Sequence, residues 1–154
     1  MKNFSNAYIK ISKLGFSLIE LIVAIGVAAI ISGTLLYFLN PASQFAQARN
    51  NQRTSHINII ASAVRSRMTD NHGIFQTNCS SGPLPSTTTQ MGSGAGNYNA
   101  EPCVVPIYIS VMPLDPSVGT STATGYSIIY NSTTAQITIS APNAELGQTI
   151  SITR

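Results

Sequence analysis

Few side chains in this 154-residue sequence are of a type that could do chemistry. Glu20 is the single charged residue in an apolar segment of 24 residues that runs from Phe16 to Leu39. An ionisable group in such a segment is unfavourable unless it is paired, so it suggests a function. The alternative is that Glu20 lies near the end of the segment and extends its carboxylate to the aqueous interface.

Cys79 and Cys103 bracket a region, residues 74–102, that is rich in Gly, Ser, Thr, Pro and Asn and is therefore predicted to be a long loop. Outside the cytoplasm an even pair of cysteines predicts a disulfide, which would stabilise the fold by roughly 3.5 kcal/mol in the chain-entropy model. In a reducing cytosol the same residues would be two free thiols.

The remaining candidates for catalysis or metal binding are isolated. His56 and His72 have no cysteine or acid at ligand spacing, and we interpret them as surface or helix-end histidines. The sequence contains no phosphate-binding loop, carboxylate dyad, metal-ligand cluster or nucleophile with an oriented base. We therefore predict that the protein is not an enzyme and uses no cofactor.

The apolar segment is long enough to position Glu20 within a membrane. A helix of this length spans about 36 Å, and the hydrocarbon core of a bilayer is about 30 Å thick. Three lysines precede the segment and two arginines follow it closely. This distribution favours a cytoplasmic N-terminus, with the polar remainder outside the cytoplasm.

The start of this segment resembles a known signal. Residues 15–20 read GFSLIE, follow a short basic leader and open the apolar helix. This combination resembles the class III signal of type IV prepilins and pseudopilins. The resemblance implies cleavage after Gly15 by a prepilin peptidase, methylation of the new Phe16 amine, and a role for Glu20 in assembly. The carboxylate would face the Phe16 amine of an adjoining copy and set the axial register of a helical filament.

A second helix is predicted beyond Asn40-Pro41, which interrupts the apolar run. An amphipathic stripe is formed by Ile57, Ile60, Ala61, Val64 and Met68. We expect this stripe to pack on a sheet, with Arg53, Ser55, Ser62 and Arg65 largely off it. The helix is predicted to end near residues 71–73, with Gly73 as the stop.

Short β patterns fill the rest of the chain. The run 104–111 is interrupted by Pro106 and is predicted to be an edge strand. Residues 126–130 and 136–140 are predicted to form a hairpin, and residues 149–153 alternate as a further strand. The expected fold class is α+β: a long N-terminal helix, half membrane-spanning and half amphipathic, packed on an antiparallel sheet of three or four strands, as in pilins.

The region around Asp115 is similar to the PxDP…GY region of bacterial pseudopilins, some of which bind calcium there. Calcium requires about six to eight oxygen ligands. The other acidic residues of the region, Glu101 and Glu145, are distant in sequence. We interpret Asp115 as a structural turn residue, with calcium ligation as the alternative.

The predicted organisation is therefore a cleaved leader (residues 1–15), a transmembrane and assembly helix (16–39), and an extracytoplasmic stem and head (40–154). We expect a structural subunit of a type IV pilus or secretion pseudopilus. Its partners would be other copies of itself, prepilin peptidase, the inner-membrane assembly platform and the membrane.

Two other interpretations are open. The chain could be a single-span membrane-anchored binding protein, or a secreted protein cleaved after the Ala46-Gln47-Ala48 triplet. Four arginines lie on the stem, namely Arg49, Arg53, Arg65 and Arg67. We interpret them as a solvated or subunit-facing surface and do not predict a nucleic-acid partner.

Overall fold

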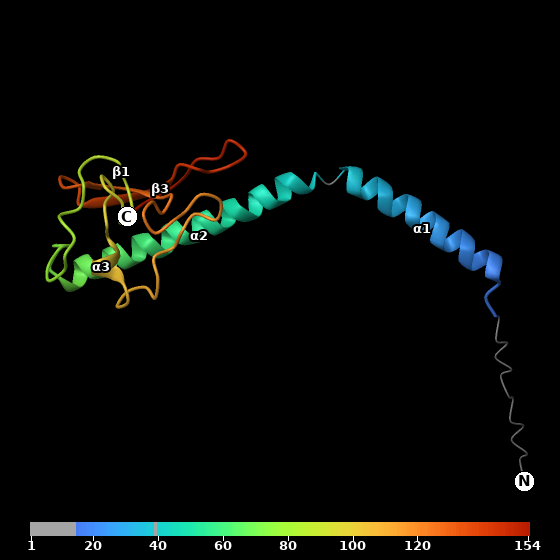
Figure 1. Cartoon of the computed structure of the whole chain (residues 1–154), viewed down its shortest axis with the longest axis horizontal. Coiled ribbons are helices and arrows are strands. Elements are labelled where there is room, and N and C mark those ends of the chain that lie inside the picture. Colours follow the sequence, from blue (N-terminus) through green and yellow to red (C-terminus); the bar gives the residue numbers. More distant parts are fainter. Residues whose placement is uncertain (1–14, 39) are drawn as a thin grey trace, which may run out of the picture. The chain divides into compact units, whose positions relative to one another are not determined.

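The structure is a computed structural model that describes residues 15–38 and 40–154, and the chain divides after Pro41 into two compact units (Figure 1). Of the predicted leader, only Gly15 lies within the described residues. The leader's lysines and Leu39 lie outside them, so those predictions stay predictions.

The first unit contains helix α1, Leu18–Phe38. Hydroxyl groups in it are satisfied within the helix: Ser32 donates to the carbonyl of Ala28 (2.8 Å) and Thr34 to that of Ile31 (2.9 Å). Large apolar side chains expose half or more of their surface at Leu18, Ile19, Leu21, Ile22, Val23, Ile25, Val27, Ile30 and Ile31. Among the described residues, no helix is both long enough and apolar enough to cross a membrane.

Helix α2, Pro41–Asp70, begins at the boundary between the two units, and from Ala42 onward it belongs to the second. Proline is suited to the first helical position, because its missing N–H would have no helical partner there. All five residues of the predicted stripe are buried, which confirms the face that packs on the sheet. The helix ends at Asp70, next to the predicted end at residues 71–73. The Gly73 N–H closes it by donating to the Met68 carbonyl at 2.7 Å. Both His72 (φ 54°) and the expected Gly73 (φ 89°) have positive φ after the helix.

A four-stranded antiparallel sheet covers α2, with strand order β1-β2-β3-β4. Its strands are β1 (Thr89–Gln90), β2 (Ser127–Asn131), β3 (Gln136–Ala141) and β4 (Ile150–Thr153). The predicted hairpin is confirmed as β2 and β3, with Asn131 opposite Gln136, and the last predicted strand is confirmed as β4. The sheet has four strands, within the predicted three or four, but its edge strand β1 lies in the segment predicted to be a loop.

The predicted edge strand over residues 104–111 is wrong. The chain forms a short helix there, α3 (Glu101–Val104), followed by turns. The Val105 N–H donates to the Glu101 carbonyl and the Tyr108 N–H to the Val104 carbonyl, so these groups are used locally. Pro106 has no N–H to donate and follows a cis peptide bond. Composition therefore predicted a strand where local turns satisfy the backbone.

The core of this unit lies between α2 and the sheet. It combines the α2 stripe with inward side chains of the hairpin, among them Ile128, Ile137 and Ile139, each at most 1% exposed. Alternate residues of β3 are buried, as the sequence pattern predicted. The Cys79–Cys103 disulfide is confirmed, with Cα atoms 5.3 Å apart, and it joins the segment after α2 to α3.

Candidate functional site

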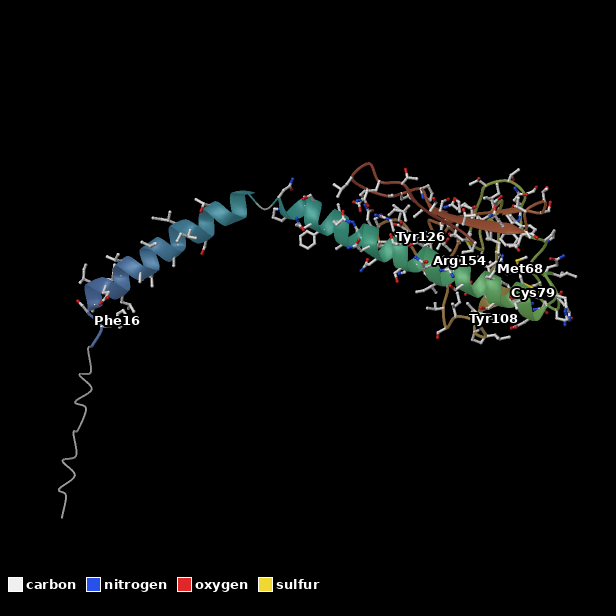
Figure 2. All side chains as sticks on the ribbon, turned by 180° about the vertical axis from the view of Figure 1, so that it is seen from behind. Phe16, Met68, Cys79, Tyr108, Tyr126 and Arg154 are labelled. Atoms are coloured by element: carbon white, nitrogen blue, oxygen red, sulfur yellow. A yellow bond between two sulfur atoms is a disulfide. The ribbon has the colours of Figure 1, made fainter. Side chains whose placement is uncertain are left out.

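The segment GFSLIE, residues 15–20, is exposed. Residues 15–17 precede α1 in non-helical conformation, and Phe16 is 78% exposed (Figure 2). Glu20 lies exposed in the first turn of α1, where a carboxylate is favoured by the unpaired N–H groups of the helix start. The Gly15–Phe16 peptide bond thus lies outside a helix.

A second arrangement of charged groups lies in the second unit of the chain, residues 42–154, which is called the head from here on. It surrounds the fully buried Arg53. Its guanidinium Nε and Nη2 bind both carboxylate oxygens of Asp115, at 2.7 and 3.2 Å. Nη1 donates to Asn50 Oδ1 at 2.9 Å and to a Glu145 carboxylate oxygen at 2.8 Å. Nη2 also donates to Ser117 Oγ at 2.8 Å. All five guanidinium N–H groups are therefore satisfied, which is the condition for burying the charge.

Asp115 organises the turn that follows it. Its Oδ1 accepts hydrogen bonds from the N–H groups of Ser117 (2.9 Å) and Val118 (3.2 Å) and from the Ser117 hydroxyl. The backbone packs closely around it: a Cβ added at Gly119 would lie 2.3 Å from the Asp115 nitrogen. Asp115 is thus a turn residue with a cation already beside it. Among the described residues no group of three or more His, Cys, Asp or Glu is placed to hold a metal ion.

Glu145 fastens the β3–β4 loop, residues 142–149, to α2. Its carboxylate forms a bidentate pair with Arg49, at 2.7 Å for both bonds, in addition to its bond with Arg53. The Asn50 side chain donates to the Glu145 carbonyl (2.8 Å) and accepts from its N–H (3.0 Å). Sequence reasoning found no acids near these arginines, because both acids come from distant loops.

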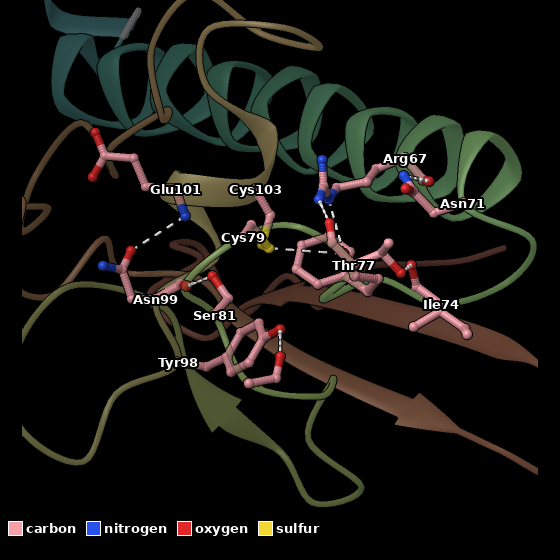
Figure 3. The surroundings of a disulfide bond; sticks show 12 residues. Arg67, Asn71, Ile74, Thr77, Cys79, Ser81, Tyr98, Asn99, Glu101 and Cys103 are labelled. Atoms are coloured by element: carbon pink, nitrogen blue, oxygen red, sulfur yellow. Dashed lines mark hydrogen bonds between the residues drawn. A yellow bond between two sulfur atoms is a disulfide. The ribbon is translucent and has the colours of Figure 1, made fainter.

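Two of the arginines interpreted as surface residues are buried, so that interpretation was wrong for Arg53 and Arg67. Arg67 donates to the carbonyls of Phe75 (2.8 Å) and Thr77, which fixes the segment leading to Cys79 (Figure 3). Its guanidinium also lies 5.9 Å from the centre of the Phe75 ring. The burial of Arg53 could have been found in the sequence, since it lies four residues before Ile57 and so extends the apolar stripe backwards.

The two histidines differ in environment. His56 is half-buried, and its Nδ1 lies 2.8 Å from the Tyr126 hydroxyl. Tyr126 is fully buried, and burial raises the pKa of its phenol. His72 is exposed at the end of α2, as interpreted from the sequence. The polar contact between His56 and Tyr126 joins α2 to the segment entering β2.

The ionised state of the buried cluster is strongly favoured. Burial by itself would raise the pKa of Asp115, but the hydrogen bonds from Arg53, Ser117 and Val118 lower it to about 2. The hydrogen bonds from Arg49 and then Arg53 lower the pKa of Glu145 to about 2. The same contacts raise the pKa of Arg53. This cluster is charged throughout the physiological range, so it serves to hold structure rather than to transfer protons.

Comparison of the chain with protein-family models, with curated proteins and with solved structures finds no match. Its function is therefore argued from its own residues.

Removal of the Arg53 guanidinium should strongly destabilise the head. We expect Arg53→Met to lower the free energy of unfolding by about 3–5 kcal/mol, because Asp115 would stay buried without its cation. The matched control is Arg65→Met on the exposed side of α2, which should change stability by less than about 0.5 kcal/mol. Urea unfolding of the full chain in detergent micelles measures both. Equal stability of the two variants would contradict the role of Arg53.

Acid should weaken the same cluster. The pKa of Asp115 is lowered from 3.8 to about 2 on folding, so its contribution to stability is present above pH 4 and is lost as the pH falls toward 2. Glu145 adds a smaller loss over a similar range, because solvent screens its partly exposed carboxylate. We expect Asp115→Asn to be less stable at neutral pH but to lose less stability on acidification. An unchanged slope of unfolding free energy against pH in that variant would refute this assignment.

Proposed function

We propose that this protein is a type IV pilin-like subunit, a precursor held in the cytoplasmic membrane that is trimmed after Gly15 and polymerises into a filament outside the cytoplasm. The observation that carries the proposal is the sequence GFSLIE at residues 15–20, placed where the chain enters α1, with Glu20 in the first helical turn. A basic leader precedes this sequence, and a run of apolar residues follows it.

The exposure of α1 supports the proposal. A soluble monomer rarely exposes a continuous apolar surface, because water is a poor solvent for it. Large side chains all around α1 are exposed, among them Leu18, Ile25 and Ile30 at 60% or more. Lipid would cover this surface in the precursor, and the α1 helices of neighbouring copies would cover it in the filament. Small residues such as Gly26 and Gly33, around which nothing lies within 4 Å of an added Cβ, would let helices approach closely.

Glu20 gives the assembly its register. Cleavage creates an α-amine on Phe16 that is cationic at neutral pH. Either charge alone among apolar side chains is unfavourable, and the cost falls when the amine of one copy meets the carboxylate of the next. Since Glu20 is the single charged residue of α1, one axial offset between copies satisfies both groups and the other offsets leave them unpaired.

The head has the properties of a structural module. Arg49, Arg53, Asp115 and Glu145 form one cluster of ion pairs and the two cysteines form a disulfide, so these groups are used in holding loops together. A subunit of this kind would rely on a separate cytoplasmic ATPase for energy. Its partners would be other copies of the chain, prepilin peptidase and the inner-membrane assembly platform.

Mass spectrometry of the mature N-terminus tests the proposal directly. We expect the chain from filament or membrane fractions to begin at Phe16 with a methylated amine, because the peptidase removes the leader before assembly. A start at Met1 would instead support the single-span anchored binding protein. A start at Arg49 would support a secreted protein cut by signal peptidase, and either result would exclude a pilin-like function.

Substitution of Glu20 tests assembly. We expect Glu20→Ala to insert into the membrane and to be cleaved normally, but to give at least about tenfold fewer filaments, because the Phe16 amine loses its partner. Glu101→Ala, which removes an exposed acid from the head, is the matched control and should assemble normally. Electron microscopy and immunoblotting of sheared surface material measure the yield. Normal yield from Glu20→Ala would disprove the register mechanism.

A further inference from the structure

Leu146, in the β3–β4 loop, is held in an unusual way. It has a left-handed backbone conformation (φ 58°), which is unfavourable for a bulky branched residue, and its side chain is 54% exposed. Neither property helps the isolated head to fold. A residue that persists in such a conformation requires surrounding contacts that enforce it, and these residues gather at functional positions.

The enforcing contacts lie on both sides of Leu146. On one side Glu145 is bound to Arg49, Asn50 and Arg53, as described above. On the other side Gln148 accepts a hydrogen bond from the Asn50 side chain (2.9 Å) and donates to the Gln47 side chain (3.1 Å). Leu146 is therefore a fixed apolar projection beside the first half of α2, and the ion pairs and hydrogen bonds of Glu145 and Gln148 determine its position.

An apolar pocket lies at the other end of α2. Its volume is about 320 Å³, and its lining includes Met68, Ile74, Phe75, Leu84, Tyr130 and Ser132. Ile74 is 51% exposed although it lies between the end of the helix and the buried Phe75. Figure 2 places Met68 toward the end of α2 that is farther from α1 along the chain. The pocket is lined mainly by apolar side chains, together with the hydroxyl-bearing residues Tyr130 and Ser132, and this lining suits a leucine side chain.

We propose that Leu146 of one copy inserts into this pocket on the next copy in the filament, an inference that rests on the proposed function. The loop that carries Leu146 is bound to α2 at Asn50, and the pocket borders α2 at Met68. Leu146 and the pocket are therefore about 27 Å apart along the helix. Two complementary surfaces at opposite ends of one rigid unit form a heterologous contact, which joins copies head to tail without closing. A second copy of the chain is therefore the occupant.

The size of the contact also points to a second copy. One leucine in a pocket is far below the roughly 1,200 Å² that a stable complex in solution buries. A separate partner would not be retained by it. A neighbouring copy would, because packing of α1 already holds that copy at high effective concentration and the second contact becomes intramolecular. The contact thus selects the orientation of heads that α1 has brought together.

Cysteine cross-linking in filaments tests the contact. The double variant Leu146→Cys with Ser132→Cys places one thiol on the projection and one at the rim of the pocket, while the native cysteines stay paired with each other. We expect mild oxidation of sheared filaments to give a ladder of dimers, trimers and longer species on non-reducing gels, because each copy contributes both halves of the contact. Each single variant should stay monomeric.

The matched control is Leu146→Cys with Ser121→Cys, an exposed residue at a different pocket, which should give no ladder. Filaments that form normally but give no ladder from the first double variant would overturn this contact and leave the pilin-like function intact. An absence of filaments from the unmodified chain would overturn both. Cross-linking of the single Leu146→Cys variant to a different protein would show another occupant and also overturn the inference.

A second measurement does not depend on thiols. Leu146→Ser should lower the number of filaments that survive shearing by about tenfold, whereas Val118→Ser, which alters a residue of similar exposure (55%) on another loop, should not. Leu146→Gly should leave the head at least as resistant to urea, since glycine adopts the left-handed conformation freely, yet should weaken filaments equally. Full shear resistance in both Leu146 variants would disprove the contact.

Discussion

A buried guanidinium carries a large desolvation penalty, and in this protein that constraint determines where two loops lie. Arg53 is 0% exposed, so its five N–H groups need five acceptors within the fold. α2 itself provides only the Asn50 side chain. The remaining acceptors come from Asp115 and Ser117 in one loop and from Glu145 in another. The two loops must therefore meet at one place on α2, and the stem helix and the head become one body.

The other end of α2 is fixed in a similar way, by a buried arginine whose hydrogen-bond acceptors come from another segment. Arg67 is also buried, but it binds the backbone carbonyls of Phe75 and Thr77 instead of acids. This holds the chain as it turns back from the helix toward Cys79, whose disulfide then anchors it to α3. Only 8% of the residues in the sequence are charged, yet two of the five arginines, Arg53 and Arg67, are buried inside the fold.

Local patterns made part of this structure predictable. The 3.6-residue period of the α2 stripe, the alternation in β3 and the turn between Asn131 and Gln136 each depend on neighbours in sequence, and each prediction was confirmed. The Arg53 cluster was not predictable, because Asp115 and Glu145 are 62 and 92 residues away and only the fold brings them together. β1 has two residues, too few for a period to be recognised. The run at 104–111 has strand composition, yet local turns satisfy its backbone.

The two units of the chain differ in what they contribute to association. In the proposed filament, the exposed apolar surface of α1 would drive association without fixing a direction, and the Glu20 carboxylate would fix the axial offset. The head also exposes large apolar side chains, and one of them, Leu146, is positioned by hydrogen bonds on both flanks. Strong contacts between heads would drive association before the α1 helices are aligned, and a misaligned polymer would then be trapped. Weak but oriented contacts would act only after α1 has aligned the copies. A rigid head is therefore more useful to a filament than a head with high affinity for other heads.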